Sequence, residues 1–481
     1  MAGTHLTFLV FLSWLTVCIM TTNAYKTNSN VVDVKVMCME REKQALLKLK
    51  DDLVDKNDQL SSWGTSDDCC NWTGVRCNNR TGHVYALQLN QQKLQLNDST
   101  LEKNYSMQFK WDISSPLLEL KHLAYLTMSM VRATSIPQFI GSLKHLMHLE
   151  MSDCDLSGTI PHQLGNLTRL VFLDLSNNNF HKVESLSWLS RLPALKHLDL
   201  SSTDLSGTTD WFQAINSLPY LHNLYLSDCG LSLVISPPLF HSNYSPASLA
   251  DIDLSQNSLT SSILPWLFDF NNSLVHLKLC YNEFLRKNPK SFGAMINLES
   301  LDLSENHFEG EIPRALGNLG RLESLDLSWN SLVGEVPDMK NLSFISTLDL
   351  SENKLNGSWI ENIQLLSHLE YLDISSNFMN GTISEISLLN LTKLTYLDIS
   401  SNAFVFNLSL NWTPPFQLET LIMRSCKLGP SFPQWLRTQR RISHLDISSN
   451  FMNGTISEIN LLNLIKLRYL DISSNILQVG A

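Results

Sequence analysis

Charged residues are scarce in this sequence. They make up 17% of its 481 residues, and acidic residues outnumber basic ones, so the formal net charge is −11. A nucleic-acid partner would call for a basic face, so this balance argues against DNA or RNA binding. The sequence also lacks a phosphate-binding loop, a kinase signature and an H-E-x-x-H motif, which argues against the enzymes that depend on them.

Long apolar runs are equally scarce. One stands at the N-terminus, Leu6–Met20, and small residues follow it up to Ala24, as at a signal-peptidase site. We predict a signal peptide at residues 1–24 and a linker at 25–37. The alternative, an N-terminal membrane anchor, needs a longer run. No later stretch approaches about 18 apolar residues, so we predict no further membrane span and entry into the secretory pathway.

Cysteines are few and unevenly placed. Of the nine, Cys18 lies in the predicted signal peptide. Adjacent cysteines do not easily bond to each other, and four clustered cysteines allow three pairings. We choose Cys38–Cys69 with Cys70–Cys77, because these pairs give two loops that do not cross. The remaining cysteines lie far apart and are interpreted as free thiols: Cys154, Cys229, Cys280 and Cys426.

N-x-S/T sequons are abundant, which suits a secreted chain. Pro246 makes the sequon at Asn243 doubtful. A composition rich in Asn and Ser would produce some sequons without any glycan. We expect N-glycans among the others, which begin at Asn71, Asn79, Asn97, Asn104, Asn166, Asn271, Asn341, Asn356, Asn380, Asn390, Asn407, Asn411 and Asn453.

One motif recurs along most of the chain. "FLDLSNNNF" at Phe172 returns as "SLDLSENHF" at Ser300 and "TLDLSENKL" at Thr347. The units recur about every 24 to 25 residues, which is typical of leucine-rich repeats. We predict about sixteen units over residues 84–481, with an insertion near 93–111 and an incomplete last unit.

The residue pattern of a unit explains its structure. Alternation directs Leu173 and Leu175 inward and Asp174 outward, onto an exposed sheet face. A buried Asn178 can bond the backbone of the adjacent coil, so stacked units would form a ladder of amides. Cys154, Cys229 and Cys426 occupy the same position, where packing explains them better than reactivity. The Gly and Pro of "LSGTIP" then favour a bend and short helical turns on the convex side.

The first repeat needs a cover for its open end. Residues 42–54 predict a short amphipathic helix with Ala45, Leu46, Leu49 and Leu53 on one stripe. We interpret residues 38–83, which also hold Trp63 and Trp72, as a disulfide-stapled cap.

The cap string "CMEREKQALLKLK" with "LSSWGTSDDCCNWTGVRCNNRTGHV" resembles the N-terminal cap of plant extracellular leucine-rich-repeat receptors. The L-x-G-x-I-P segments are similar to the repeat of these plant proteins. The chain most resembles receptor-like proteins of the fungal ethylene-inducing-xylanase receptor type. This resemblance implies an α/β solenoid: a right-handed curved superhelix with a concave parallel β-sheet, a plant-specific second strand and a disulfide-stapled cap.

The resemblance also implies a function. Such proteins are non-catalytic, bind a peptide, protein or glycan on the repeat face in defence or developmental signalling, and signal through a partner receptor kinase. Full-length relatives sit in the plasma membrane, whereas this chain would be extracellular or apoplastic. It stops at "SSNILQVGA", inside a repeat, so we expect a chain truncated before the C-terminal cap and transmembrane segment.

Two alternatives stay open. The chain could be a non-functional truncated receptor copy, or a soluble inhibitor of a pathogen cell-wall-degrading enzyme, similar to polygalacturonase-inhibiting proteins. The inhibitors end in a disulfide-bonded cap, and no closing cysteine pair stands near the end of this sequence, which disfavours the inhibitor.

A duplicated segment marks the C-terminal part. "SSNFMNGTISEI" runs over 375–386 and again over 448–459, in register with the repeat. This fits recombination between repeats better than one site used twice. We expect an exposed apolar edge beyond Asn475 and aggregation as its consequence.

Catalytic and metal sites are not predicted. Outward aspartates on successive strands would lie about 5 Å apart, near the spacing of a retaining glycosidase. A catalytic pair, however, needs two different environments, and the repeat gives every aspartate the same one. The four histidines that share the outward phase fall on separated units, so we predict neither a metal nor a cofactor: His148, His197, His276 and His444.

A recognition surface is the better interpretation. It would lie where the outward consensus Asp or Ser is replaced, or where an aromatic residue stands beside it, because aromatic residues and Arg are common anchors of interfaces. The alternative is drift on a solvated face. The candidate ligand-binding residues are Tyr225, Lys278, Tyr281, Trp329, Tyr371, Tyr396, Ile422 and Arg424.

Overall fold

The computed structural model describes residues 36–55, 58–90, 109–111, 113–232, 249–287, 290–456 and 463–479. One compact unit begins at Cys38. The predicted signal peptide, nearly all of the predicted linker, most of the predicted insertion and the sequons at Asn97 and Asn104 lie outside the described residues.

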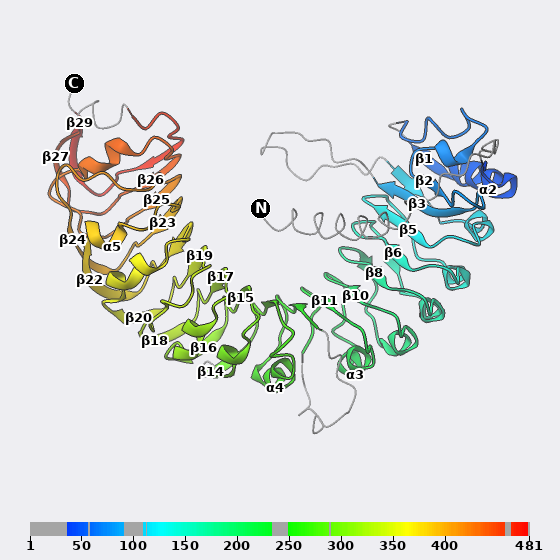
Figure 1. Ribbon diagram of the computed structural model, residues 1–481, viewed down its shortest axis with the longest axis horizontal. Helices are drawn as coiled ribbons and strands as arrows, with labels where there is room; N and C mark the ends of the chain where they lie inside the picture. The colour runs from blue at the N-terminus through cyan, green and yellow to red at the C-terminus, as the bar shows by residue number, and fades with distance from the viewer. Residues whose placement is uncertain are drawn as a thin grey trace, which may run out of the picture. The chain divides into compact units, whose positions relative to one another are not determined.

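One long sheet carries a short strand from each unit, and it lines the concave side of the stack (Figure 1). It begins with β2 (Val75–Cys77) antiparallel to β3 (Val84–Asn90), and every later pairing is parallel and in register. The later strands are β5 (Tyr125–Ser129), β6 (His148–Glu150), β8 (Phe172–Asp174), β10 (His197–Asp199), β11 (Asn223–Tyr225), β12 (Asp251–Asp253), β13 (His276–Lys278), β15 (Ser300–Asp302), β17 (Ser324–Asp326), β19 (Thr347–Asp349), β21 (Tyr371–Asp373), β23 (Tyr396–Asp398), β25 (Thr420–Ile422), β26 (His444–Asp446) and β28 (Tyr469–Asp471).

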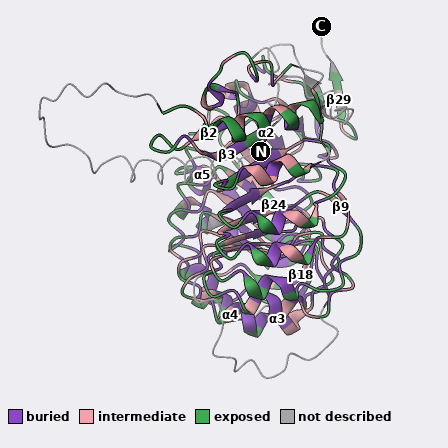
Figure 2. Ribbon diagram, turned by 90° about the vertical axis from the view of Figure 1, so that its right-hand side faces the viewer, coloured by how far each residue is buried: buried purple, intermediate pink, exposed green. Residues whose placement is uncertain are grey.

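Leucines and asparagines hold the units together. The inward leucines, such as Leu301 and Leu325, are fully buried and form the inside of the stack (Figure 2). Asn306 Nδ2 donates to Leu279 O at 2.9 Å in the preceding unit, and Asn306 Oδ1 accepts from Phe284 N at 3.2 Å. These bonds confirm the predicted amide ladder, in which each buried amide satisfies backbone groups that would otherwise lack partners.

Cysteine replaces asparagine in part of the ladder. Cys154 Sγ lies 3.1 Å from Met128 O of the preceding unit, so the thiol takes over one of the amide's contacts. Burial raises the pKa of Cys154, Cys229 and Cys426 to about 12. A thiol that stays protonated is a poor nucleophile, which agrees with the predicted packing role.

The convex side carries short helical turns, as predicted (Figure 1). Glycine allows neighbouring turns to pack closely, since a Cβ on Gly317 would meet Asp338 O at 2.2 Å. The turns are η2 (Ser115–Glu119), η3 (Gln138–Ser142), η4 (His162–Asn166), η5 (Ser187–Arg191), α3 (Trp211–Asn216), η6 (Ser261–Ile263), α4 (Leu264–Phe268), η7 (Lys290–Ala294), η8 (Arg314–Asn318), η9 (Trp359–Leu365), α5 (Glu385–Leu388) and η10 (Gln434–Thr438). None of the helices in the described ranges is long and apolar enough to cross a bilayer.

In many units a second strand lies between the concave strand and the convex helical turn. It forms a six-stranded flank sheet and two separate pairs. The six strands are β14 (Leu285–Lys287), β16 (His307–Gly310), β18 (Ser331–Glu335), β20 (Lys354–Gly357), β22 (Phe378–Ser384) and β24 (Ala403–Asn407). The pairs are β7 (Ser157–Gly158) with β9 (Asn179–Phe180), and β27 (Asn453–Ile456) with β29 (Ile476–Val479). The predicted second strand is therefore present, and among the described residues it forms separate sheets along the flank.

The cap differs from its prediction in one respect. Helix α2 (Glu40–Asp51) ends before residue 54, because β1 (Leu53–Asp55) pairs with β4 (Phe109–Trp111). The end of the predicted insertion thus belongs to the cap.

The other cap predictions are confirmed. Disulfides join Cys38 to Cys69 and Cys70 to Cys77. Trp63 stacks on Trp72 with ring centres 5.7 Å apart.

The last described unit is less covered than the others. Leu470 is 36% exposed, whereas its equivalents Leu421 and Leu445 are fully buried. Ile476 is 76% exposed, so the predicted apolar exposure beyond Asn475 is present at this residue. Aggregation remains a prediction.

Together these features form the predicted leucine-rich-repeat solenoid, with a concave parallel sheet, a second strand and a stapled cap.

Candidate functional site on the concave sheet

The concave sheet presents two columns of side chains. Alternation along a strand points its first and third residues to the same face. Because the strands pair in register, these residues align from unit to unit. From β5 to β28 we call the first residues of the strands the first column, and the third residues the second column.

Aromatic and imidazole rings fill the N-terminal part of the first column. Ring centres lie 5.8 Å apart between Tyr125 and His148, 4.2 Å between His148 and Phe172, and 4.0 Å between Phe172 and His197. Tyr225 of the second column extends the row at 5.3 Å from His197. These five residues form what we call the aromatic stripe.

The stripe was not predicted from the sequence. His148 and His197 do fall on separate units, but Phe172 between them joins them into one stack. The sequence does contain the pattern, because the first residue of the concave strand carries an aromatic or imidazole ring in four successive units. Burial, with a smaller effect of His148, lowers the pKa of His197 to about 4, so its ring is neutral above that pH. The stripe is therefore an apolar surface with polar ring atoms at its edges.

Carboxylates dominate the second column. Asp326 Oδ1 accepts from Ser328 N at 2.9 Å and from Ser328 Oγ at 2.6 Å. Burial, with neighbouring carboxylates adding to it, raises the pKa of Asp326 to about 7, and of Asp349 and Asp373 to about 6. The same Asp–Ser bonds recur at Asp302 and Asp349. These repeated environments fit a surface role better than a catalytic pair.

Three predicted residues lie near the middle of the sheet. In the register of β11, β12 and β13, Tyr225 and Lys278 stand on either side of Asp253. Lys278 Nζ lies 3.9 Å from Asp253 Oδ2. Tyr281 follows β13 with a positive φ of 54° and is 53% exposed. Asp253 therefore lies between two of the predicted residues, Tyr225 and Lys278.

Two predicted tyrosines form a pair on β21 and β23. Tyr371 stacks on Tyr396 with ring centres 4.1 Å apart, and both are half-buried. Tyr371 OH donates to Asp349 Oδ2 at 3.4 Å. Burial raises the pKa of Tyr371, and that of Tyr396 to about 12, so both keep their phenolic proton.

The remaining predicted residues stand apart from the tyrosine pair. Trp329 follows β17 and is 54% exposed. Ile422 takes a second-column position on β25. Arg424 Nε lies 3.9 Å from Asp446 Oδ2 and 3.2 Å from Ser448 Oγ. The eight predicted residues therefore spread along the concave side and do not form a single pocket.

The predicted glycan sites avoid the two columns. Eleven of the thirteen lie in the described residues, where ten asparagines are exposed and Asn271 is half-buried. None of these eleven falls in a concave strand from β5 to β28. N-glycans at these sites would leave the columns accessible.

Potential metal ligands cluster at one place within the described ranges. The cluster there that could hold an ion consists of the four cap cysteines, and all four are bonded in disulfides. A disulfide sulfur has no thiolate to offer a metal.

Comparisons with known proteins agree with this architecture. Residues 39–78 match the family described as leucine rich repeat N-terminal domain, and 268–480 match the leucine-rich repeat region. Residues 145–167 and 169–192 match single leucine rich repeats.

Two tomato proteins (Solanum lycopersicum) are similar in sequence. Receptor-like protein EIX1 is 37% identical over 88% of this chain and 51% of its own length. Receptor-like protein EIX2 is 35% identical over 56% of this chain and 26% of its own length. The chain thus spans about half the length of EIX1 and about a quarter of EIX2.

Solved structures show the same fold. The Arabidopsis receptor kinase HAESA, in complex with the peptide hormone IDA and the co-receptor SERK1, aligns with a TM-score of 0.61 at 23% identity, over 91% of this chain and 86% of that one. A TDR receptor aligns with a TM-score of 0.57 at 23% identity, over 76% and 68% of the two chains. With its plant-type cap, its repeats and its similarity to EIX1, the chain belongs to the leucine-rich-repeat proteins as a relative of the plant receptor-like proteins.

Proposed function

We propose that this chain is the non-catalytic recognition region of a plant cell-surface receptor-like protein, and that it binds a peptide or protein ligand on its concave sheet. The observation that carries the proposal is the pair of columns. An apolar aromatic stripe and a tyrosine pair lie beside a row of carboxylates, and the described sequons leave this face open.

The charge of the second column indicates the chemistry of the ligand. Of its fifteen residues eleven are Asp or Glu, and Lys278 is the one basic residue. A cationic group placed beside a carboxylate stabilises the charged form of that carboxylate. We therefore infer a ligand segment that combines Lys or Arg with aromatic or aliphatic side chains. A neutral glycan would leave the carboxylates without countercharges.

Signalling would require a partner. HAESA is described in complex with both a peptide hormone and a co-receptor. By analogy with this related fold, we infer that a partner receptor kinase joins the ligand-bound chain. Location at the plasma membrane belongs to the same proposal and rests on the similarity to receptor-like proteins.

Selection from a random peptide library displayed on phage would test the ligand chemistry. The full secreted chain is immobilised, and bound peptides are compared with those bound by Tyr396→Ala and Asp349→Asn variants. We expect enriched peptides with net positive charge, and loss of at least tenfold in affinity with either variant. Arg314→Ala on convex turn η8 is the control and should bind as the unchanged chain does.

Two outcomes would contradict the proposal: enrichment of acidic peptides, or enriched peptides whose affinity neither concave variant changes. Inhibition of a fungal polygalacturonase by the secreted chain would instead favour the inhibitor alternative.

A further inference from the structure

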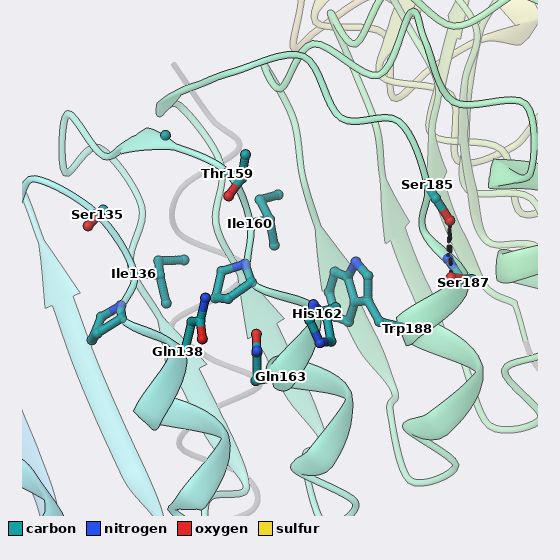
Figure 3. Close-up of a pocket in the computed structure, with 13 residues that line it drawn as sticks. Ser135, Ile136, Gln138, Thr159, Ile160, His162, Gln163, Ser185, Ser187 and Trp188 are labelled. Atoms are coloured by element: carbon teal, nitrogen blue, oxygen red, sulfur yellow. Dashed lines mark hydrogen bonds between the residues drawn. The ribbon is translucent and has the colours of Figure 1, made fainter.

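A second candidate site lies on the flank, away from the two columns. A cavity of about 550 Å³ spans three successive units, at 135–138, 158–163 and 185–188. Figure 3 shows its labelled side chains along the starts of three neighbouring helical turns, η3, η4 and η5. We propose that this flank pocket binds a neutral saccharide of one or two sugar rings.

The lining has no charged carboxylate, ammonium or guanidinium group. Its polar groups are the hydroxyls of Ser135, Thr159, Ser185 and Ser187, with the side chains of His162 and the two glutamines. A charged ligand would lose hydration here without gaining a countercharge. Sugar hydroxyls both donate and accept hydrogen bonds, as do the serine, threonine and glutamine groups of the lining. The pocket therefore favours a polar ligand without net charge.

Part of the lining is apolar. Ile136, Ile160 and Trp188 contribute it; Ile136 and Trp188 are each only 4% exposed, so the half-buried Ile160 is the most accessible of the three. Sugar rings carry C–H faces beside their hydroxyls, so they match a surface that alternates apolar and polar groups. The cavity volume falls within the usual range of small-ligand sites.

One buried acceptor in the lining lacks a partner. Gln163 Oε1 is buried and accepts no hydrogen bond within the described structure. A buried amide oxygen left unpaired is costly, and a ligand hydroxyl would satisfy it.

The hydroxyls of Ser185 and Ser187, where the pocket meets η5, are already oriented. Ser185 Oγ donates to Asp210 Oδ2 at 2.6 Å and lies 3.0 Å from Ser187 Oγ. The polar groups on this side are therefore held in place before a ligand arrives, which reduces the entropy lost on binding.

The pocket is not a general feature of the repeat. In "IPHQLGNL" at Ile160 the unit carries His162 and Gln163, whereas "IPRALGNL" at Ile312 carries Arg314 and Ala315 at the same positions. The comparison also supplies matched substitutions. Gln163→Ala and His162→Arg each install a residue that another unit of this chain already tolerates.

Isothermal titration of the full secreted chain would test the proposal. The probes are neutral cello-, manno- and xylo-oligosaccharides, with acidic oligogalacturonides as the charged contrast. We expect saturable binding of at least one neutral probe, and at least tenfold weaker binding with either pocket variant at an unchanged melting temperature. The reciprocal changes Ala315→Gln and Arg314→His should leave binding unchanged.

The saccharide could be free, or it could be an N-glycan of this chain, since Asn166 stands at the end of η4. If the chain's own glycan fills the pocket, neutral probes bind only after Asn166→Gln removes that glycan. This result would still support a neutral saccharide as the ligand of the pocket. The proposal is overturned if no neutral probe binds to either form, if Gln163→Ala binds equally well, or if the acidic probes bind more tightly. Tyr396→Ala, which tests the concave site, should not affect this titration.

Discussion

Two halves of the concave sheet share one scaffold and differ in their outward residues. From β5 to β10 the first column carries a row of neighbouring rings, whereas from β15 to β19 it carries Ser300, Ser324 and Thr347. We call β5–β11 the aromatic half and β15–β23 the acidic half, where all five second-column residues are Asp. The leucine at the second position of each concave strand is the same in both halves, so the outward chemistry changes above an unchanged row of leucines.

The buried residues of the amide ladder differ as well: the acidic half has asparagine where the aromatic half has Cys154. Substituting the asparagine should have the largest effect on the free energy of unfolding. Asn353 Nδ2 donates to Leu327 O at 2.9 Å and Asn353 Oδ1 accepts from Leu332 N at 2.9 Å, in the acidic half. Asn353→Ala leaves these buried groups unpaired and should lower the free energy of unfolding by about 3 kcal/mol. Cys154→Ala in the aromatic half should cost only about 1 kcal/mol. Urea denaturation measures both, and equal losses would refute the distinction.

The acidic half should become less stable as pH rises. Burial raises the pKa of Asp326 from the ordinary 3.8 to about 7, so the folded state keeps a proton that the unfolded state has released between these values. Stability contributed by this proton is complete below about pH 4 and is lost as pH rises towards 7. Asp326→Asn should remove a decline of about 2 kcal/mol between pH 4.5 and 7.5. Denaturation midpoints at the two pH values report it. A decline as steep in the variant as in the unchanged chain would count against this account.

The aromatic half should contain an opposite dependence. The pKa of His197 falls from 6.5 to about 4, so below pH 6.5 the unfolded state takes up a proton that the folded state refuses. Stability from this residue is present above about 6.5 and is lost as pH falls towards 4. His197→Phe should retain the stack and improve stability at pH 4.5 by about 1 kcal/mol relative to pH 7.5. Asp199 on the same strand, whose pKa burial raises to about 6, partly hides this effect in the unchanged chain. The comparison between variant and unchanged chain therefore decides the matter, and no gain at pH 4.5 would contradict it.

The residue between the halves should matter least for folding. Lys278 pairs with Asp253 at 3.9 Å, and its side chain is 53% exposed. Exposed pairs of this kind contribute little, so Lys278→Ala should change the free energy of unfolding by less than about 0.5 kcal/mol. A larger loss in urea denaturation would mean that Lys278 supports the fold and not only the surface.

The fold could be predicted because its determinants are periodic. The leucine spacing predicts the buried side of each unit, and the recurring asparagine predicts the amide ladder between units. The four clustered cysteines predict the two disulfides of the cap. The end of α2 could not be predicted, because Leu53 continues the apolar stripe of the helix and yet pairs with Trp111, far away in the sequence.

The site was harder to predict for a different reason. The sequence favours positions where the outward consensus Asp or Ser is replaced, or where an aromatic residue stands beside it, and the second criterion identifies Tyr371 and Tyr396. The same criterion missed Phe172, which stands two residues before Asp174, as Tyr371 does before Asp373, and which acquires its importance from its ring neighbours in space. The flank pocket was missed as well, since it draws on irregular segments of three units.

The amide ladder also bears on how such a chain can change length. Asn450, in the second copy of the duplicated segment, donates to Met423 O at 2.7 Å, just as Asn377 in the first copy donates to Leu350 O at 2.9 Å. An insertion of whole units renews every such bond, whereas one of any other length would leave a buried amide facing the wrong backbone. Proteins of this kind should therefore grow and shrink in steps of about 24 residues, with new surface added at each step and the old core left as it was.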